Sequence, residues 1–296
     1  MTVCNLCPRE CGKSRGNGSV GYCGVGNDIY ASKAMLHMWE EPPISGTKGS
    51  GAVFFTGCHL KCVYCQNSSI AFKSAGKSLT PGELSEVFIR LQERGAHNIN
   101  LVTPTHFVPG IIKALDISKQ TGLKIPVVYN TGGYEKRSTV ELLDDYVDIY
   151  LPDFKYMNSD TAQKYSNAPD YPQMAKESLE EMVRQQPNSV FNDDSIMQRG
   201  VVVRHLLLPG NLKNSKSVIE YLYKTYGDSI YISIMNQYTP MREFDKFPEL
   251  SCTPSRREYE KLVDYALSLG VKNAFIQDEG VSSGVYIPKF DMEGLN

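Results

Sequence analysis

Short apolar runs alternate with longer amphipathic stretches along the chain from about residue 50 onwards. Apolar runs of this length, bounded by turn-forming residues, are typical of buried strands. Strands that alternate with helices indicate βαβ units and a parallel sheet, whose right-handed crossovers allow an open or a closed barrel. The predicted strands are Ala52–Thr56, Ile99–Thr103, Val127–Thr131, Ile149–Asp153, Val201–Leu208, Ile230–Met235 and Ala274–Gln277.

The amphipathic stretches predict the helices of these units. Thr80-Pro81-Gly82-Glu83 is a capping box with proline at the first helical position, and Gly95 is a C-terminal stop for the helix that it opens. Ser255–Glu258 opens another helix in the same way, which ends near Gly270. Further helices are predicted over residues 109–120, 139–146, 171–186 and 215–226, and residues 187–199 are predicted to form a long surface loop.

Composition narrows the class of protein. The 296 residues are 41% hydrophobic and 22% charged, which suits one large α/β domain with a small appendage. The net charge of −2 implies no general attraction to nucleic acid or to an anionic membrane. No apolar run reaches the length of a membrane span and no secretory signal is recognisable, so we expect a cytoplasmic protein. Eight cysteines in a reducing compartment indicate metal ligands rather than disulfides.

The loop after the first predicted strand carries Cys58, Cys62 and Cys65 in the pattern C-x3-C-x2-C. Thiolates are the usual ligands of iron–sulfur clusters, which normally take four cysteines. A 4Fe–4S cluster held by three cysteines leaves one iron open to an outside ligand, as reactive metal sites do. A zinc site and buried structural cysteines are the alternatives. The buried strand that delivers this loop to one end of a sheet favours the cluster.

The N-terminal segment carries a second group, Cys4, Cys7, Cys11 and Cys23, in the pattern C-x2-C-x3-C-x11-C among several glycines. A segment this short buries little core, so a bound metal would hold it together. Tetrahedral zinc and a second iron–sulfur cluster both fit these ligands. We therefore predict a Cys-rich metal-binding segment over residues 1–45 and a barrel over residues 46–296, joined by a linker at Pro42-Pro43.

Polar residues follow the apolar strands at their carboxyl ends, where barrels of this class gather their chemistry. Arg204 stands inside an otherwise apolar strand, and a buried charge needs a partner, which could be a ligand carboxylate, Asp153 or Glu135. Each of these residues alone could be structural, but as a set we expect them to line a cofactor site. The set comprises Thr103, Thr105, His106, Asn130, Asp153, Lys155 and Arg204, with Gln277-Asp278-Glu279 after the last strand.

The three-cysteine loop, with Tyr64 before its last cysteine, resembles the signature of the radical S-adenosylmethionine (radical SAM) superfamily. Within that superfamily, most of residues 50–290 resemble the glycyl-radical-enzyme activases, the pyruvate formate-lyase activating enzyme group. The matching landmarks are Gly51–Asn67, Asn130-Thr131-Gly132, Leu151–Lys155 and Val203–Gly210.

The chain also departs from that group. Where the activases place a Gly-Gly-Glu motif, this sequence has Thr103-Pro104-Thr105-His106, and near Ala52 it lacks their arginine before the cluster loop. The simplest activases lack the N-terminal four-cysteine segment. The chain looks most like an activase-like branch with an N-terminal Cys-x2-Cys-Pro-x2-Cys segment.

The resemblance implies a partial (β/α)6 TIM-like barrel that holds a 4Fe–4S cluster and SAM. Such an enzyme reductively cleaves SAM at the cluster, and the resulting 5′-deoxyadenosyl radical abstracts hydrogen from a substrate. An external electron donor such as a flavodoxin or a ferredoxin is implied. The implied ligands are Cys58, Cys62 and Cys65 for the cluster; Tyr64 near the adenine; Thr103, Thr105 and His106 in place of the usual amino-group ligands; and Asp153, Lys155 and Arg204 around SAM.

By the same resemblance, the leading substrate is a backbone or side-chain position on a partner protein, and another peptide or a small metabolite is the runner-up. Two other classes of function compete. An electron-transfer iron–sulfur protein without SAM chemistry would have four ligands per cluster, which the three-cysteine loop disfavours. A zinc-dependent nucleic-acid binder needs a strongly basic segment with aromatic residues, whereas residues 9–15 offer only Arg9, Lys13 and Arg15.

Overall fold

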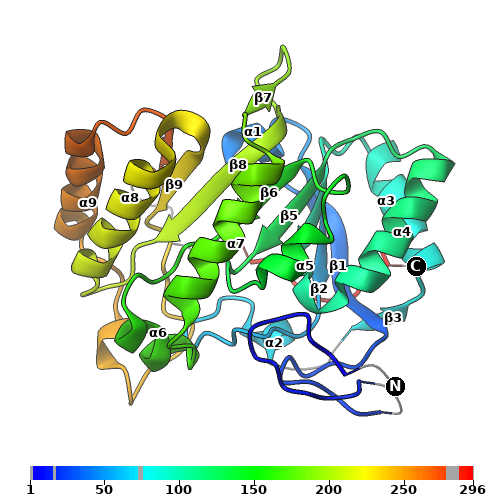
Figure 1. Ribbon diagram of the computed structural model, residues 1–296, viewed down its shortest axis with the longest axis horizontal. Coiled ribbons are helices and arrows are strands. Elements are labelled where there is room, and N and C mark those ends of the chain that lie inside the picture. The colour runs from blue at the N-terminus through cyan, green and yellow to red at the C-terminus, as the bar shows by residue number, and fades with distance from the viewer. Residues whose placement is uncertain (1–2, 16–17, 73–75, 278–286, 296) are drawn as a thin grey trace.

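A mostly parallel sheet runs through the molecule in the computed structural model, which describes residues 3–15, 18–72, 76–277 and 287–295 (Figure 1). Successive parallel strands follow one another across the sheet in chain order, as expected for consecutive right-handed βαβ units. These strands are β2 (Ser50–Phe55), β4 (Ile99–Val102), β5 (Val127–Thr131), β6 (Ile149–Pro152), β8 (Met197–Leu206), β9 (Tyr231–Met235) and β10 (Ala274–Ile276).

Three antiparallel strands extend this sheet. β1 (Ile29–His37) pairs with β2, and β3 (Lys77–Leu79) pairs with the start of β1. β7 (Val190–Phe191) forms a hairpin with the first residues of β8.

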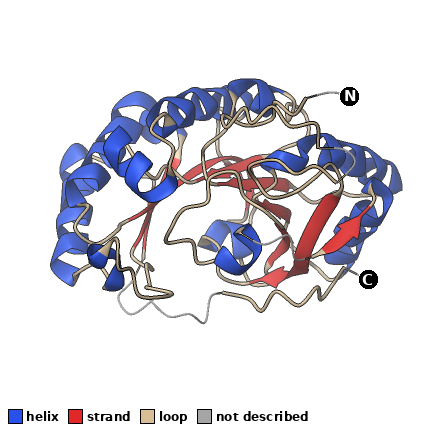
Figure 2. Cartoon of the chain, turned by 90° about the horizontal axis from the view of Figure 1, so that it is seen from below, coloured by secondary structure: helices blue, strands red, loops and turns tan. Residues whose placement is uncertain are grey.

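The longer helices in the connections lie on the outer side of the curved sheet (Figure 2). The longer ones are α3 (Pro81–Glu93), α4 (Val108–Thr121), α6 (Ser159–Ser166), α7 (Tyr171–Gln185), α8 (Leu212–Tyr226) and α9 (Arg256–Leu269). The short ones are α1 (Pro42–Ser45), α2 (Ser68–Ala71) and α5 (Arg137–Glu141), with single 3-10 turns at Thr105–Phe107, Gly227–Ser229 and Pro248–Ser251.

Along the central strands, successive side chains point alternately to the face that the helices cover and to the inner face of the sheet. On the inner face, an apolar cluster gathers around Ile44 of α1 and includes Val128, Leu151 and Val202. Two residues further along each strand, the same face carries Asn130, Asp153 and Arg204, because side chains two apart share a face. The inner face therefore has an apolar layer, with polar groups above it at the carboxyl ends of the strands.

The sequence predictions of fold class and regular elements are largely confirmed. Each predicted strand corresponds to an observed one, and the sheet fits a partial TIM-like barrel. Both predicted capping boxes are present: Thr80 and Glu83 close the start of α3, and Ser255 and Glu258 close the start of α9. Gly270 ends α9 with φ +94.

Three predictions in less regular segments need correction. Pro42-Pro43 is not a linker but opens α1, where proline fits the first helical turn and buried Ile44 supplies the packing. Residues 187–199 are not one loop, because Val190 pairs with Arg199 in the β7–β8 hairpin. The helix predicted at 139–146 is shorter, spanning Arg137–Glu141.

β1 escaped prediction because it interrupts its apolar residues with Ser32 and Lys33. Lys33 is nearly buried and its ammonium contacts the carboxylates of Asp291 and Glu293, each at 2.8 Å. β1 belongs to the sheet although it lies within residues 1–45. The division of the chain at about residue 45 stays a prediction. In the part of the chain that the structure describes, no helix is both long enough and apolar enough to cross a membrane. Asp278 and Glu279 lie outside the described residues.

Candidate functional site

The three-cysteine loop begins where β2 ends. Gly57 has φ +86, and a Cβ added there would lie 2.7 Å from the Cys23 carbonyl oxygen, so this turn requires glycine. The Cys58 N–H donates to the same carbonyl at 3.2 Å, and the Val63 N–H donates to the Tyr165 carbonyl at 2.9 Å. Backbone bonds to two distant segments therefore hold the loop in place.

The sulfurs of Cys58, Cys62 and Cys65 line one cavity and form no disulfide. Burial raises the pKa of Cys58 and of Cys65, and the neighbouring sulfurs raise both further. Three thiolates at this position therefore need a positively charged partner. Hydrogen-bond donors already face two of the sulfurs: Ser166 Oγ lies 3.1 Å from Cys62 Sγ, and the Leu60 N–H lies 3.4 Å from Cys58 Sγ.

This donor set fits a 4Fe–4S cluster. Each cysteine of such a cluster binds a different iron, so the ligands stand further apart than those around one ion. Three sulfurs around the cavity would leave the fourth iron open to an outside ligand.

The cavity has a volume of ≈ 180 Å³ and lies at the carboxyl ends of the parallel strands. Most of the site residues predicted from the sequence meet there, although they come from different strands. Those that line it are Cys58, Cys62, Tyr64, Cys65, Thr103, Asn130, Asp153, Lys155 and Arg204, together with Gln66, Asn67, Gln237 and Tyr238.

Arg204 is the centre of a polar network at the base of this cavity. Its guanidinium donates to Asp153 Oδ1 at 2.9 Å, to Glu40 Oε2 at 3.0 Å and to Asn130 Oδ1 at 2.5 Å. Lys155 Nζ lies 2.6 Å from the other oxygen of Asp153. The network confirms Asp153 as a partner of Arg204, and among the described residues these bonds use three of the five guanidinium N–H groups.

Electrostatics keep this network charged although it is buried. Burial alone would raise the pKa of Asp153, but Lys155 and Arg204 outweigh it and hold that pKa below its usual value. Burial likewise opposes the charge of Lys155 and of Arg204, yet Asp153 raises the pKa of both. Two cations and a carboxylate therefore face the cavity in fixed positions.

Glu40 and Asn100 belong to the network but escaped the sequence analysis. Glu40 precedes α1 and accepts hydrogen bonds from Asn100 and Asn130, in addition to the ion pair with Arg204. Asn100 could have been found from the sequence, because it interrupts the apolar run Ile99–Val102 and a buried amide needs a hydrogen-bond partner. Nothing in the local pattern marked Glu40.

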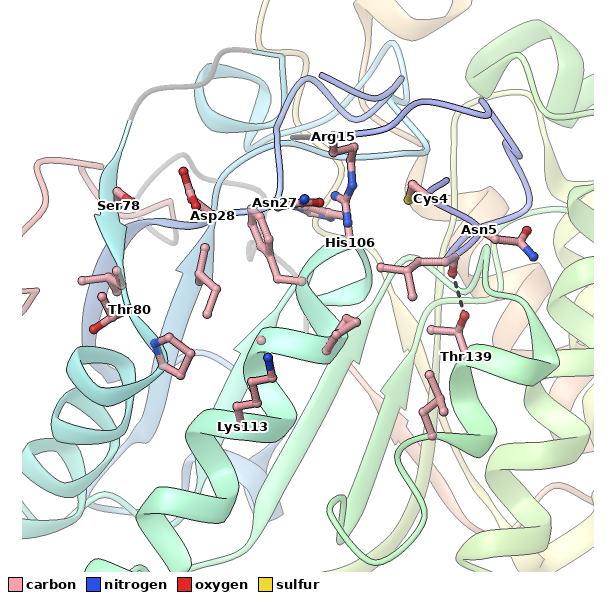
Figure 3. Close-up of a pocket in the computed structure, with 18 of the residues that line it drawn as sticks. Cys4, Asn5, Arg15, Asn27, Asp28, Ser78, Thr80, His106, Lys113 and Thr139 are labelled. Atoms are coloured by element: carbon pink, nitrogen blue, oxygen red, sulfur yellow. Dashed lines mark hydrogen bonds between the residues drawn. The ribbon is translucent and has the colours of Figure 1, made fainter. Parts of the chain in front are cut away.

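Thr105 and His106 do not lie on this cavity, although Thr103 does. The Thr105 hydroxyl donates to Glu135, and His106 Nε2 donates to the Thr56 carbonyl at 2.8 Å. His106 lines a different pocket of ≈ 790 Å³, below Arg15 and between the N-terminal segment and helices α3 and α4 (Figure 3). We therefore leave Thr105 and His106 out of the site proposed below.

The cysteines of the N-terminal segment lie near one another. A Cβ added to Gly21 would lie 3.3 Å from Cys23 Sγ and 3.4 Å from Cys11 Sγ. Burial raises the pKa of Cys7 to about 12, and the nearby Cys23 and Cys4 sulfurs raise it further. Among the described residues, these cysteines included, no three His, Cys, Asp or Glu side chains are arranged to hold one metal ion, so a metal site in this segment stays a prediction.

Arg9, between two of these cysteines, fastens the segment to the barrel. Its guanidinium donates to the His59 carbonyl at 2.8 Å and the Ser166 carbonyl at 2.8 Å, and it also bonds to the carbonyls of Leu60 and Asn167. The same group lies over the Tyr22 and Tyr134 rings at 4.3 and 5.1 Å. One side chain therefore bridges the N-terminal segment, the cluster loop and the end of α6.

The chain is similar to several known proteins. An uncharacterised protein of Methanocaldococcus jannaschii is 27% identical over 273 residues, covering 89% of this chain and 74% of that protein. The pyruvate formate-lyase-activating enzyme of Clostridium pasteurianum is 29% identical over 117 residues, covering 36% of this chain and 46% of the enzyme. HydG, a maturase of the FeFe-hydrogenase, shares the fold with a TM-score of 0.52 at 17% identity, over 74% of this chain and 49% of that chain.

The chain thus spans about half the length of the activating enzyme and of HydG. A family model described as the radical SAM superfamily matches residues 52–220, which include the three-cysteine loop and the strands that carry Asn130, Asp153 and Arg204. The chain belongs to the radical SAM superfamily.

Proposed function

We propose that this chain is a radical SAM enzyme in which Cys58, Cys62 and Cys65 hold the 4Fe–4S cluster beside a SAM site at the strand ends. The observation that carries the proposal is that three unbridged thiols and the Asp153–Arg204 pair line the same cavity. When bound, the cluster supplies the electron that cleaves SAM to a 5′-deoxyadenosyl radical, which takes hydrogen from the substrate.

The charges around the cavity match the charges of SAM. SAM carries an ammonium, a carboxylate and a sulfonium, so its site needs both signs of charge. The carboxylate of Asp153 faces the cavity as an acceptor, and Lys155 and the unused N–H groups of Arg204 are donors for a carboxylate. Asn130 and Thr103 add neutral polar groups to the lining, and Tyr64 offers an aromatic ring for the adenine.

For the substrate, we propose a backbone or side-chain position on a partner protein, as for the glycyl-radical-enzyme activases. The support is the 117-residue likeness to the pyruvate formate-lyase-activating enzyme. The alternatives are radical modification of another peptide or a small metabolite, and an electron-transfer role without SAM chemistry. A flavodoxin or a ferredoxin is the proposed electron donor.

For the N-terminal segment, we propose zinc or a second iron–sulfur cluster on Cys4, Cys7, Cys11 and Cys23. The support is that Cys11 and Cys23 lie beside Gly21, that Cys4 and Cys23 lie near enough to Cys7 to raise its pKa, and that none of the four forms a disulfide. The unbridged state of the cysteines also supports a reducing compartment, the cytoplasm.

The test is anaerobic reconstitution, followed by iron, sulfide and zinc counts and a dithionite assay for 5′-deoxyadenosine. We expect about four irons for one cluster, or about eight if the N-terminal segment holds a second one. Cys62→Ala should abolish deoxyadenosine formation. Cys252→Ala is the matched control, because Cys252 is exposed and lies outside both cysteine groups. Deoxyadenosine formation by Cys62→Ala, or none by a fully loaded native protein, would refute the proposal.

A further inference from the structure

Three hydroxyl groups form a continuous buried chain that ends on the sulfur of Cys62. Ser166 Oγ lies 3.1 Å from Cys62 Sγ, the Tyr156 hydroxyl lies 2.8 Å from Ser166 Oγ, and the Tyr64 hydroxyl lies 2.8 Å from the Tyr156 hydroxyl. Tyr156 is fully buried, Ser166 is 2% exposed and Tyr64 is 9% exposed. The far end of this hydroxyl chain, Tyr64, lines the cavity.

The direction of each hydrogen bond follows from the sulfur end. A thiolate bound to iron carries no proton, so Ser166 must donate its hydroxyl proton to Cys62. The Ser166 oxygen is then free to accept from Tyr156, and the Tyr156 oxygen to accept from Tyr64. Every donor points toward the sulfur, and aligned hydrogen bonds in a low-dielectric interior strengthen one another.

The backbone fixes the first link of this chain. Val63, next to Cys62, donates its N–H to the carbonyl of Tyr165, next to Ser166, at 2.9 Å. Ser166 is the last residue of α6, where Asn167 turns the chain with φ +48. Arg9 holds the Ser166 carbonyl at 2.8 Å. The serine hydroxyl is therefore held against the sulfur by bonds that do not involve its side chain.

We propose that Ser166, Tyr156 and Tyr64 are positioning residues that raise the reduction potential of the cluster through Cys62. The inference rests on the proposed ligation of the cluster by Cys62. Hydrogen bonds to the sulfurs are among the factors that set the potential of an iron–sulfur cluster. A donor stabilises the more negative, reduced state more than the oxidised state, so it makes the cluster easier to reduce.

The test is a potentiometric titration of the reconstituted protein, monitored by electron paramagnetic resonance. In Ser166→Ala we expect the ratio of reduced to oxidised cluster at a fixed potential to fall about tenfold, which is ~59 mV for a one-electron couple. Tyr156→Phe should shift the midpoint in the same direction by less, and Tyr64→Phe by least, because each acts through the next hydroxyl.

Two further variants separate this effect from a structural one. Ser166→Thr keeps the hydroxyl and should keep the native potential. Ser215→Ala removes an equally buried serine hydroxyl, which among the described residues donates to the carbonyl of Asn211, just before α8, and should leave the potential unchanged.

The outcomes are distinct. An unchanged midpoint in a fully loaded Ser166→Ala protein overturns the inference. If Ser166→Ala fails to bind the cluster, the midpoint of Tyr156→Phe decides, and a native value there overturns the inference equally. Failure of Cys62→Ala to alter the cluster would instead refute the proposed ligation and leave the hydroxyl chain without a cluster to act on.

Discussion

At the scale of single residues, burial keeps several titratable groups next to the site neutral. His59 Nε2 donates to the Tyr134 carbonyl at 2.7 Å, and burial lowers the pKa of His59 to about 4. Glu135 Oε1 lies 3.9 Å from the same nitrogen, but burial raises the pKa of Glu135 to about 7 even though Thr105 and Thr131 donate to it. Near pH 6 these two groups are therefore neutral neighbours and not an ion pair.

Glu135 gives a pH dependence of stability with a definite sign. Its pKa is raised from 4.5 in the unfolded chain to about 7 in the folded protein, so its contribution is complete below pH 4.5 and is lost as the pH rises through 7. Over that window it should remove roughly 3 kcal/mol from the free energy of unfolding. Glu135→Gln should abolish this slope in urea unfolding measured between about pH 4.5 and pH 7.

Glu181→Gln is the control for that experiment. A hydrogen bond from Arg184 lowers the pKa of Glu181, so the stability that Glu181 contributes is present above pH 4.5 and is lost as the pH falls. Glu181→Gln should therefore alter how the free energy of unfolding depends on pH at acidic pH. Identical pH slopes in native protein and Glu135→Gln would show that Glu135 titrates normally.

At the scale of elements, helix boundaries follow from local chemistry. The Thr80 hydroxyl accepts the Glu83 N–H at 3.2 Å, while the Glu83 carboxylate accepts the Thr80 N–H at 2.7 Å. These bonds satisfy two of the N–H groups that every helix leaves unpaired at its start. They depend only on residues three apart, which is why the sequence predicted this boundary and the equivalent one at Ser255.

Thr80→Ala should lower the free energy of unfolding by about 1 kcal/mol, since it removes one side of the capping box of α3. Equilibrium urea denaturation measures the loss. Thr121→Ala is the control, because Thr121 is also exposed and, within the described part of the chain, its hydroxyl bonds to carbonyls of its own helix α4. Equal effects of the two substitutions would argue against a stabilising cap.

At the scale of the whole molecule, the N-terminal segment is part of the construction of the site. Cys58, a proposed cluster ligand, donates its N–H to the carbonyl of Cys23, a proposed ligand of the second metal. Arg9 adds bonds to four carbonyls, two in the cluster loop and two at the end of α6. Order in the segment and order in the cluster loop are therefore coupled.

Arg9→Lys should weaken this coupling, because an ammonium cannot replace the planar guanidinium at several acceptors at once. We expect the reconstituted variant to lose its cluster to an iron chelator several times faster than the native protein, as followed by the visible absorbance. Lys13→Ala is the control, since among the described residues the Lys13 side chain has no hydrogen bond or ion pair. Equal rates of cluster loss in native protein and Arg9→Lys would show that the bonds of Arg9 do not protect the cluster.

The sequence alone determined the parallel sheet, most helices and the cysteine loop, because periodicity, capping and ligand spacing are properties of neighbouring residues. It also placed Asn130, Asp153 and Arg204 at strand ends, since parallel strands bring their carboxyl ends to one edge. Thr105 and His106 also follow the second strand as expected, but they do not line the cavity and instead bond to Glu135 and to the Thr56 carbonyl.

Only the tertiary structure decided which distant groups meet. Glu40 and Arg204 are 164 positions apart, and Cys62 and Ser166 are 104 apart, so no local pattern relates either pair. Their contact depends on the register of the strands, on the close approach at Gly57 and on where α6 ends. Such contacts form because the fold buries these polar groups, and a buried polar group must find a partner from another part of the chain.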